Sequence, residues 1–339
     1  MKRVTIKDVA LEAGVSLAAV SRVFTNTAGS SARMREKVQK AAKDLGYRPS
    51  MLAKGLVGQR TNLITLVSGR MADPFDALFL DRLSERLAQL KMRLLLASSA
   101  LQGPNESGFF QALDYQSDAV IVSAGTMPLD HSSACVRNGL PVLLMGRIVE
   151  QPGVDCALAD NGNGARMAAE LLLRTGCRRL GYLGRGGETF SDRERFKGFA
   201  DALSGSGTDL KRYALKGTPD NENVFRTANT ILSDKHRPDG IFCSSDSLAF
   251  GVIEAARALG ISIPDDLSVI GFNNVPQAGW RSFQLTTIDL SVNHCIETGI
   301  ELLNRRLENS ERCPLIRRIP VELVVRGTTR QIPAGGKES

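Results

Sequence analysis

The sequence predicts an N-terminal all-α head with a helix-turn-helix, followed by an α/β body made of two Rossmann-like lobes. Three observations lead to this prediction. The surplus positive charge is confined to the first 60 residues. In those residues, short stretches with a helical pattern are joined by tight turns. From residue 61 onward, apolar runs alternate with helical segments. We expect the head to span residues 1–48, a connecting helix and linker 49–60, and the body 61–339.

Charge separates the head from the body. Residues 1–60 carry twelve Lys or Arg side chains and four acidic ones, a net charge of +8. The rest of the chain carries 31 basic and 32 acidic side chains, a net charge of −1. A head of this charge attracts a polyanion such as duplex DNA.

Cysteine spacing and the N-terminus predict a cytoplasmic protein. The six cysteines occur singly, without the spacings of metal sites, which fits free thiols in a reducing compartment. Met1 leads directly into a charged helical pattern rather than into the apolar run of a signal peptide. No stretch reaches the roughly eighteen uninterrupted apolar residues of a membrane span, so we expect no membrane partner.

The first two helices of the head are separated by a very short turn. Thr5 and Asp8 form a capping box for a helix that Gly14 ends. Ser16 then caps a second helix over residues 17–25, and helices joined this tightly cross at a steep angle. Small apolar residues make the predicted contact between them: Val9, Ala10, Ala13, Val15, Val20 and Val23.

A third helix is expected between Ser31, its N-cap, and Gly46, which stops it. Its apolar positions recur at the spacing of one helical face and are Met34, Val38, Ala41, Ala42 and Leu45. A generic three-helix domain is the alternative, because it would show the same pattern of helices and caps. The exact residues of the head decide between the two.

Four runs of residues distinguish the head from a generic three-helix domain: Val4–Ala10, Ala13–Ser16, Val20–Val23 and Leu45–Pro49. They closely resemble the DNA-binding head of the lactose/galactose-repressor family. The resemblance implies that the second helix enters the major groove of DNA. The DNA-binding residues that it implies in the head are Thr5, Ser16, Leu17, Ala18, Ser21 and Arg22.

By this correspondence Leu17, Ala18 and Arg22 face base edges, while Ser16 and Ser21 hold phosphates. Arg22 is the only long hydrogen-bond donor among the three base-facing residues. An arginine can bond both O6 and N7 of a guanine, which is worth about 1 to 3 kcal/mol of discrimination. The other two offer apolar contact, for instance to a thymine methyl group.

The segment after Pro49 resembles the hinge helix of the same family. Ser50–Leu56 is a short amphipathic stretch, and the resemblance implies that Leu56 enters the minor groove beside Ala53. An ordinary linker helix is the alternative. Gly55 stands where a larger residue is expected, and it lowers helix stability by about 1 kcal/mol relative to Ala.

Two series of apolar strands, separated by helical segments, predict the body. The expected strands are 63–68, 93–98, 119–123 and 141–146, then 179–184, 240–244 and 267–272. Each series fits a parallel sheet with crossover helices. In such sheets a ligand lies beyond the carboxyl ends of the strands.

The resemblance continues through the body in six motifs: Asp73–Phe75, Ala159–Asn161, Arg195–Phe199, Ser245–Gly251, Ile263–Phe272 and Leu285–Ile288. Their order is that of the family's effector-binding core, which is similar to periplasmic sugar-binding proteins. The resemblance therefore implies a bilobed, periplasmic-binding-protein-like body that holds a small-molecule effector and forms a homodimer.

Arg195 corresponds to the family's effector-binding arginine, whose guanidinium grips a hydroxyl pair or a carboxylate. A surface salt bridge with Asp192 or Glu194 is the alternative. Asn273 stands where the family usually has an aspartate, so one negative charge is removed from the cleft. We expect an effector of the sugar or sugar-acid type, and two arginines, Arg195 and Arg147, without that aspartate favour a ligand that carries a carboxylate or a phosphate. Further candidates for the cleft are Phe75, Arg147, Ser191, Ser245 and Trp280.

Together these features predict a sequence-specific transcriptional repressor that binds a near-palindromic operator as a dimer. Leu78, Leu83 and Leu87 are candidates for the dimer interface, with burial in the core as the alternative. Residues after Leu323 lack the leucine heptads of a tetramer-forming tail. The effector either releases DNA or promotes its binding, since both responses use the same two-lobe equilibrium.

Two other function classes fit the body alone. A solute-binding transport protein conflicts with the basic head and the missing signal peptide. A sugar-modifying enzyme conflicts with the three distant histidines and with the lack of any nucleophile, base or metal cluster in the sequence. The sequence therefore predicts no enzyme, no cofactor and no metal site.

Overall fold

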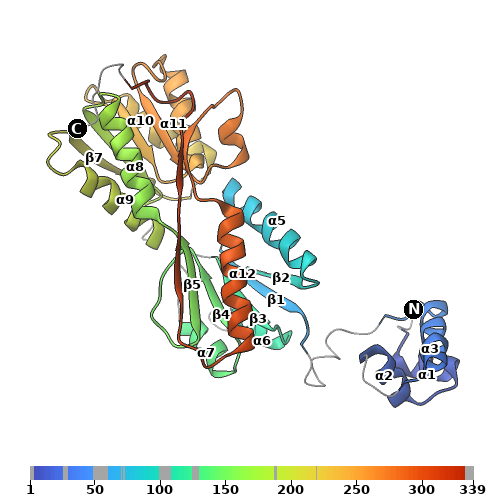
Figure 1. The fold of residues 1–339 in the computed structure, drawn as a ribbon. Coiled ribbons are helices and arrows are strands. Elements are labelled where there is room, and N and C mark those ends of the chain that lie inside the picture. The colour runs from blue at the N-terminus through green and yellow to red at the C-terminus, as the bar shows by residue number, and fades with distance from the viewer. Residues whose placement is uncertain are drawn as a thin grey trace. The chain divides into compact units, whose positions relative to one another are not determined.

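The computed structural model describes residues 4–25, 30–48, 60–69, 71, 73–98, 108–123, 130–186, 189–218 and 220–332. The chain divides into two compact units, Met1–Leu63 and Ile64–Ser339. Figure 1 shows the three helices of the first unit and the two lobes of the second. Among the described residues, none of the helices has the length and apolar character needed to cross a lipid bilayer.

The first unit contains the three predicted helices, α1 (Ile6–Ala13), α2 (Leu17–Thr25) and α3 (Ala32–Asp44). The Asp8 carboxylate accepts from the Thr5 N–H and the Thr5 hydroxyl at 2.7 Å each, so α1 is capped as predicted. All six small apolar residues predicted between the first two helices belong to the core of the unit, Val15 as a partly buried member.

The first lobe of the second unit is built on a six-stranded sheet of order β11-β5-β4-β3-β1-β2. Its strands are β1 (Leu63–Ser68), β2 (Arg93–Ser98), β3 (Ala119–Val122), β4 (Val142–Met145), β5 (Val154–Ala159) and β11 (Ile316–Ile319). Its helices are α5 (Pro74–Gln89), α6 (Gly108–Asp114), α7 (Asp130–Arg137) and α12 (Val292–Glu308). Strands β1, β3, β4, β5 and β11 pair in parallel.

The second lobe is built on a sheet of order β12-β10-β9-β8-β6-β7. Its strands are β6 (Arg179–Gly184), β7 (Asp209–Ala214), β8 (Gly240–Cys243), β9 (Ser268–Phe272), β10 (Thr286–Asp289) and β12 (Glu322–Val324). The helices are α8 (Asn161–Arg174), α9 (Phe190–Leu203), α10 (Asn221–Leu232), α11 (Asp246–Ala258) and the 3₁₀ turn η1 (Pro276–Gly279). Strand β12 runs antiparallel to β10, whereas the other pairs are parallel.

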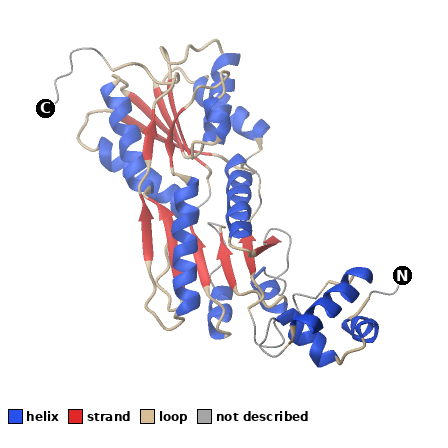
Figure 2. Ribbon diagram, turned by 45° about the vertical axis from the view of Figure 1, so that its right-hand side comes forward, coloured by secondary structure: helices blue, strands red, loops and turns tan. Residues whose placement is uncertain are grey.

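The predicted fold class is confirmed: two mainly parallel sheets are flanked by helices (Figure 2), and all seven expected strands form within one residue of their bounds. Sequence patterns missed β5, β7, β10, β11 and β12. Two of these are polar, exposed edge strands, with Asp209–Ala214 at one edge and Ile316–Ile319 at another. They lack the apolar run that marks a buried strand.

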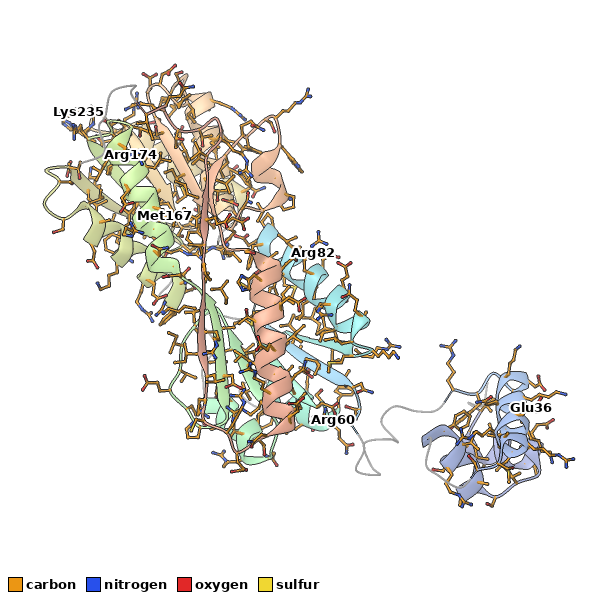
Figure 3. The ribbon with its side chains drawn as sticks, viewed as in Figure 1. Glu36, Arg60, Arg82, Met167, Arg174 and Lys235 are labelled. Carbon is orange, nitrogen blue, oxygen red and sulfur yellow. The ribbon has the colours of Figure 1, made fainter. Side chains whose placement is uncertain are left out.

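Of the three α5 leucines proposed for a dimer interface, Leu78 is half-buried and the other two are buried in the core. Leu83 and Leu87 are 2% and 1% exposed and pack in the core with Ile64 and Leu66, so the core alternative holds for them. Arg82 of the same helix is exposed (Figure 3) and pairs with Glu85 at 3.2 Å. The place of Leu78 in a dimer interface stays a prediction.

Buried Asp155 joins α12 and the segment before β11 to strand β5. Its carboxylate accepts from both Arg306 (Nε 3.1 Å, Nη2 3.0 Å) and Arg312 (Nη2 2.7 Å, Nη1 3.0 Å), and from the Leu315 N–H at 2.8 Å. The side chains of Asp155 and Arg306 are each 2% exposed. Removing one charge would leave its partners buried without compensation.

We expect Asp155→Asn to lower the free energy of unfolding by about 3 to 5 kcal/mol, the usual loss when a buried ion pair is broken. Urea denaturation of the full chain measures this. Asp201→Asn is the control, because Asp201 pairs with Lys197 at an exposed site and should change stability little. Equal effects of the two substitutions would contradict a stabilising role for the cluster.

Candidate functional site

The predicted DNA-binding residues of α2 lie on the exposed side of the head. Ser16, Leu17, Ala18 and Arg22 are exposed, Leu17 at 45%, while the valines at positions 20 and 23 are buried in the core. The Ser16 hydroxyl accepts from the Ala19 N–H at 3.2 Å, so it caps α2 as expected. Helix α2 thus presents an apolar, hydroxyl and guanidinium surface to solvent.

Of the four remaining residues proposed for DNA contact, two lie in the described part of the structure and two lie outside it. Thr5 is exposed at the start of α1, and Ser21 is half-buried on α2. Ala53 and Leu56 fall outside the described residues, as does the predicted hinge helix. Their contact with DNA stays a prediction, as it does for the exposed residues of the head.

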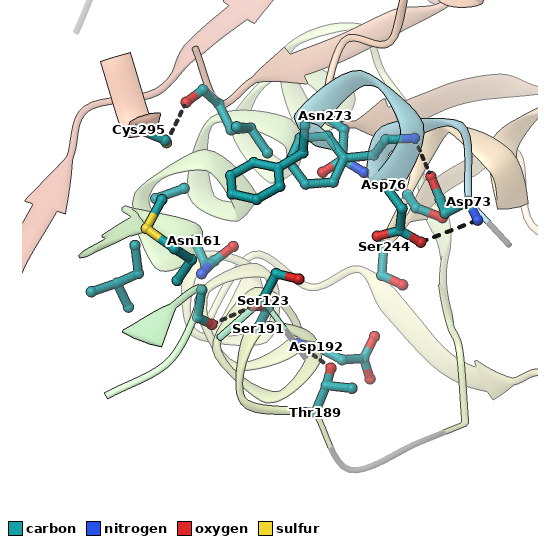
Figure 4. A pocket seen from close by; sticks show the side chains of 18 of the residues that line it. Asp73, Asp76, Ser123, Asn161, Thr189, Ser191, Asp192, Ser244, Asn273 and Cys295 are labelled. Atoms are coloured by element: carbon teal, nitrogen blue, oxygen red, sulfur yellow. Dashed lines mark hydrogen bonds between the residues drawn. The ribbon is translucent and has the colours of Figure 1, made fainter. Parts of the chain in front are cut away.

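A cavity of about 210 Å³ lies where the two lobes meet, beyond the carboxyl ends of both sheets. Side chains that follow strands of either lobe surround it (Figure 4). Ser123 follows β3 and Gly146 follows β4 in the first lobe, whereas Arg185, Ser244 and Asn273 follow β6, β8 and β9 in the second. A small polar molecule held there would contact both lobes at once.

Five of the seven effector-binding candidates line this cavity: Phe75, Ser191, Arg195, Ser245 and Asn273. The other two do not. Arg147 is 9% exposed within the first lobe, and burial lowers its pKa. Trp280 is 55% exposed and follows η1.

Arg195 is held by three groups of its own lobe. Its Nε donates to Asn161 Oδ1 at 2.8 Å, its Nη1 donates to the Ser244 carbonyl, and its guanidinium stacks 3.6 Å from the centre of the Phe272 ring. Burial lowers its pKa to about 10, so the side chain stays charged at neutral pH. The third nitrogen, Nη2, bonds to no described residue and can donate to a ligand.

The surface salt bridge considered for Arg195 does not form. Asp192 accepts from the Tyr182 hydroxyl at 2.9 Å, and Glu194 pairs with Arg318 at 2.8 Å. Close packing of α8 and α9 brings Arg195 to its partners, because a Cβ at Gly198 would lie 2.4 Å from the Gly162 oxygen. The glycine in the Arg195–Phe199 motif is therefore needed for this approach.

Two further cavity residues are unusual, Ser245 because its hydroxyl is unpaired within the described part of the chain and Asn273 because of its backbone conformation. Ser245 is the N-cap of α11, yet its hydroxyl caps nothing, is buried at 2% exposure and has no hydrogen-bond partner among the described residues. Asn273 has a φ of 114°, a strained conformation for a residue other than glycine. Unpaired buried groups and strained backbone concentrate at ligand sites.

Carboxylates also line the cavity, and sequence reasoning missed them as site residues. They belong to Asp73, Asp76 and Asp192; Asp73 pairs with Arg185, and the charge of Asp192 acts on both Arg185 and Arg195. The arginine that lines the cavity together with Arg195 is Arg185 rather than Arg147, and three carboxyl groups line it as well.

The Asp76 carboxylate is partly buried, and its hydrogen bonding offsets little of the free-energy cost of that burial. It accepts from the Asp73 N–H at 3.3 Å, and burial raises its pKa to about 6. Because the folded state binds this proton more tightly than the unfolded chain does, the group lowers stability progressively as pH rises from about 4 to 6. Its ionised form thus opposes folding at neutral pH.

We expect Asp76→Asn to raise the free energy of unfolding by about 1 kcal/mol at pH 7, because the amide keeps the acceptor and removes the buried charge. The gain should fade at pH 4.5. Chemical denaturation at both pH values measures it, with exposed Asp81→Asn on the same helix as control. A gain independent of pH would count against burial as its cause.

Comparisons with known proteins cover both units of the chain. Residues 5–50 match the lacI family of bacterial regulatory proteins, and residues 169–329 match the periplasmic binding protein-like domain. The chain is 30% identical over 331 residues to the HTH-type transcriptional regulator DegA of Bacillus subtilis, a match that covers 96% of this chain and 98% of DegA. It is 28% identical to the HTH-type transcriptional repressor PurR of Photobacterium profundum, with 97% and 99% covered.

A solved structure shares the fold over the same extent. The Lac repressor dimer bound to operator and the anti-inducer ONPF superposes with a TM-score of 0.85 at 23% sequence identity. The match covers 97% of this chain and 100% of that one. The two named relatives are transcriptional regulators rather than enzymes.

Proposed function

The chain belongs to the lacI family of bacterial regulatory proteins, and from this premise we propose how its parts divide the work of a DNA-binding transcriptional repressor. Residues 1–48 bind DNA, residues 49–60 form the hinge helix and linker, and residues 61–339 bind the effector and dimerise. A regulator of transcription acts on the chromosome, so we assign the chain to the cytoplasm. We assign it no catalytic activity.

DNA recognition is assigned to the exposed side of α2. Arg22 reads a guanine edge, Leu17 and Ala18 contact apolar base surface, and Ser16 and Ser21 hold phosphates. Thr5 adds a contact from α1. Ala53 and Leu56 complete the interface in the minor groove. The basic excess of the first 60 residues supplies the nonspecific attraction that precedes this recognition.

Effector binding is assigned to the cavity between the lobes. The observation that carries this assignment is Ser245, a buried hydroxyl at the cavity wall without a partner among the described residues. Arg195 Nη2 and the Asn273 amide offer further polar contacts, and Phe75 and Ser191 lie on the same cavity. A sugar or sugar acid fits such a set, because it presents several hydroxyls and an optional carboxylate.

Two copies of the chain are needed for operator binding. One head provides too few phosphate contacts for physiological affinity, so a homodimer addresses two half-sites of a near-palindrome. The Lac repressor structure is such a dimer on its operator. The effector shifts an equilibrium between two lobe arrangements and thereby changes DNA affinity, with a typical coupling of about 1 to 3 kcal/mol.

The DNA assignment is tested with an operator selected from random duplexes by the full chain. We expect Arg22→Ala to weaken binding of that operator by about 10- to 100-fold and to relax preference at one base pair. Lys43→Ala is the control, because it removes one positive charge from the exposed side of α3. If both variants lose affinity equally, Arg22 contributes charge alone and the base contact is refuted.

The effector assignment is tested by thermal shift with neutral sugars and their acids. A stabilising ligand should lose its effect in Arg195→Ala and in Ser245→Ala, because both remove polar contacts from the cavity. Arg226→Ala, at an exposed position on α10, should respond as the unmodified chain does. Retained stabilisation in both cavity variants would place the ligand elsewhere, and tight binding of neutral sugars only would exclude sugar acids.

A further inference from the structure

One carboxylate of the first lobe is bound by side chains of the second lobe. Asp73, the N-cap of α5, uses Oδ1 to accept from the Phe75 N–H at 2.9 Å within its own lobe. Its Oδ2 accepts from the Ser247 hydroxyl at 2.6 Å and from Arg185 Nη2. Arg185 follows β6 and Ser247 lies in the first turn of α11, so both donors belong to the second lobe.

The capping role of Asp73 does not require these contacts. One carboxylate oxygen satisfies the first turn of α5, and the other is left to cross between the lobes. The Asp73 side chain is only 4% exposed, so the ion pair with Arg185 is shielded from solvent on the carboxylate side. Charge-assisted bonds of this kind are stronger than bonds between neutral groups, and they weaken little with salt.

A guanidinium and a hydroxyl converging on one oxygen make a site for carboxylates. Arg185 and Ser247 come from different elements of the second lobe and both donate to Asp73 Oδ2. We propose that they form a carboxylate-binding cradle, and that Asp73 is its built-in occupant, which latches the two lobes together without any effector.

The latch sets the fraction of molecules in which the two lobes are held together, the closed arrangement, before a ligand binds. Two other contacts cross the same boundary. The bond from the Ser191 hydroxyl to the Gly146 carbonyl at 3.0 Å is neutral and weaker, and the ion pair between Glu194 and Arg318 is more exposed to solvent, with side chains 22% and 42% exposed. Loss of the Asp73 contact therefore shifts the protein toward the open arrangement and leaves the cradle free for an added carboxylate. The latch goes beyond the proposed function, and its test uses neither effector nor DNA, so either can fail alone.

Chemical rescue of the full chain tests the proposal. Asp73→Ala should increase the radius of gyration measured by small-angle X-ray scattering and lower Tm by roughly 2 to 4 °C. Sodium acetate, compared with sodium chloride at equal ionic strength, should restore part of both changes, because its carboxylate occupies the cradle. The rescue should disappear when Arg185→Gln is added to Asp73→Ala.

Asp73→Asn separates the latch from the helix cap, because its amide oxygen still accepts from the Phe75 N–H. This variant should also open the lobes, with a smaller loss of Tm than Asp73→Ala. Asp201→Ala, which removes an exposed carboxylate, serves as control and should show neither opening nor an acetate effect. An unchanged radius in Asp73→Asn, or an acetate response that persists without Arg185, would overturn the latch.

Discussion

The body depends on three crossings of the chain between its lobes, at Asp160, at Leu290–Ser291 and at Pro320–Val321. Each lobe is therefore completed by a segment that returns late in the sequence. The Asp160 N–H donates to the Ile319 carbonyl at 2.9 Å, so the first and third crossings lie side by side. Neither sheet can close before the C-terminal strands have been placed, and the two lobes must mature together.

This arrangement places a residue of the cavity directly at the boundary between the lobes. Asn161 directly follows the first crossing, is buried, and orients the Arg195 guanidinium through its amide oxygen. The guanidinium that we assign to effector binding is thus held by a residue at the boundary between the lobes. Asp155 performs the complementary task at the remote end of the first lobe, where it fastens the returning segment to β5. Rigid lobes with few connections favour motion as whole bodies.

Sequence patterns predicted the architecture better than the strand count. Central strands such as Leu63–Ser68 are apolar on both faces and were readily recognised, and the caps at Thr5 and Ser31 follow local rules. The edge strand Asp209–Ala214 has no such signature, because its exposed positions carry Asp, Lys and Arg and none of its residues is fully buried. Its pairing with β6 depends on neighbours distant in sequence, which no local pattern records.

The site divides in a similar way between local and nonlocal information. Arg195, Ser245 and Asn273 occur within or beside recognisable motifs and were predicted as cleft residues. Arg185 could not be predicted from local sequence, because it is a single arginine in a glycine-rich turn. Its role depends on its contact with Asp73, which lies in the other lobe. Charges that the fold satisfies internally hold the lobes together, whereas Ser245 and Arg195 Nη2 keep hydrogen-bonding capacity for a ligand. The two sets share one cavity, so a ligand that engages the second set acts directly on the arrangement that the first set maintains.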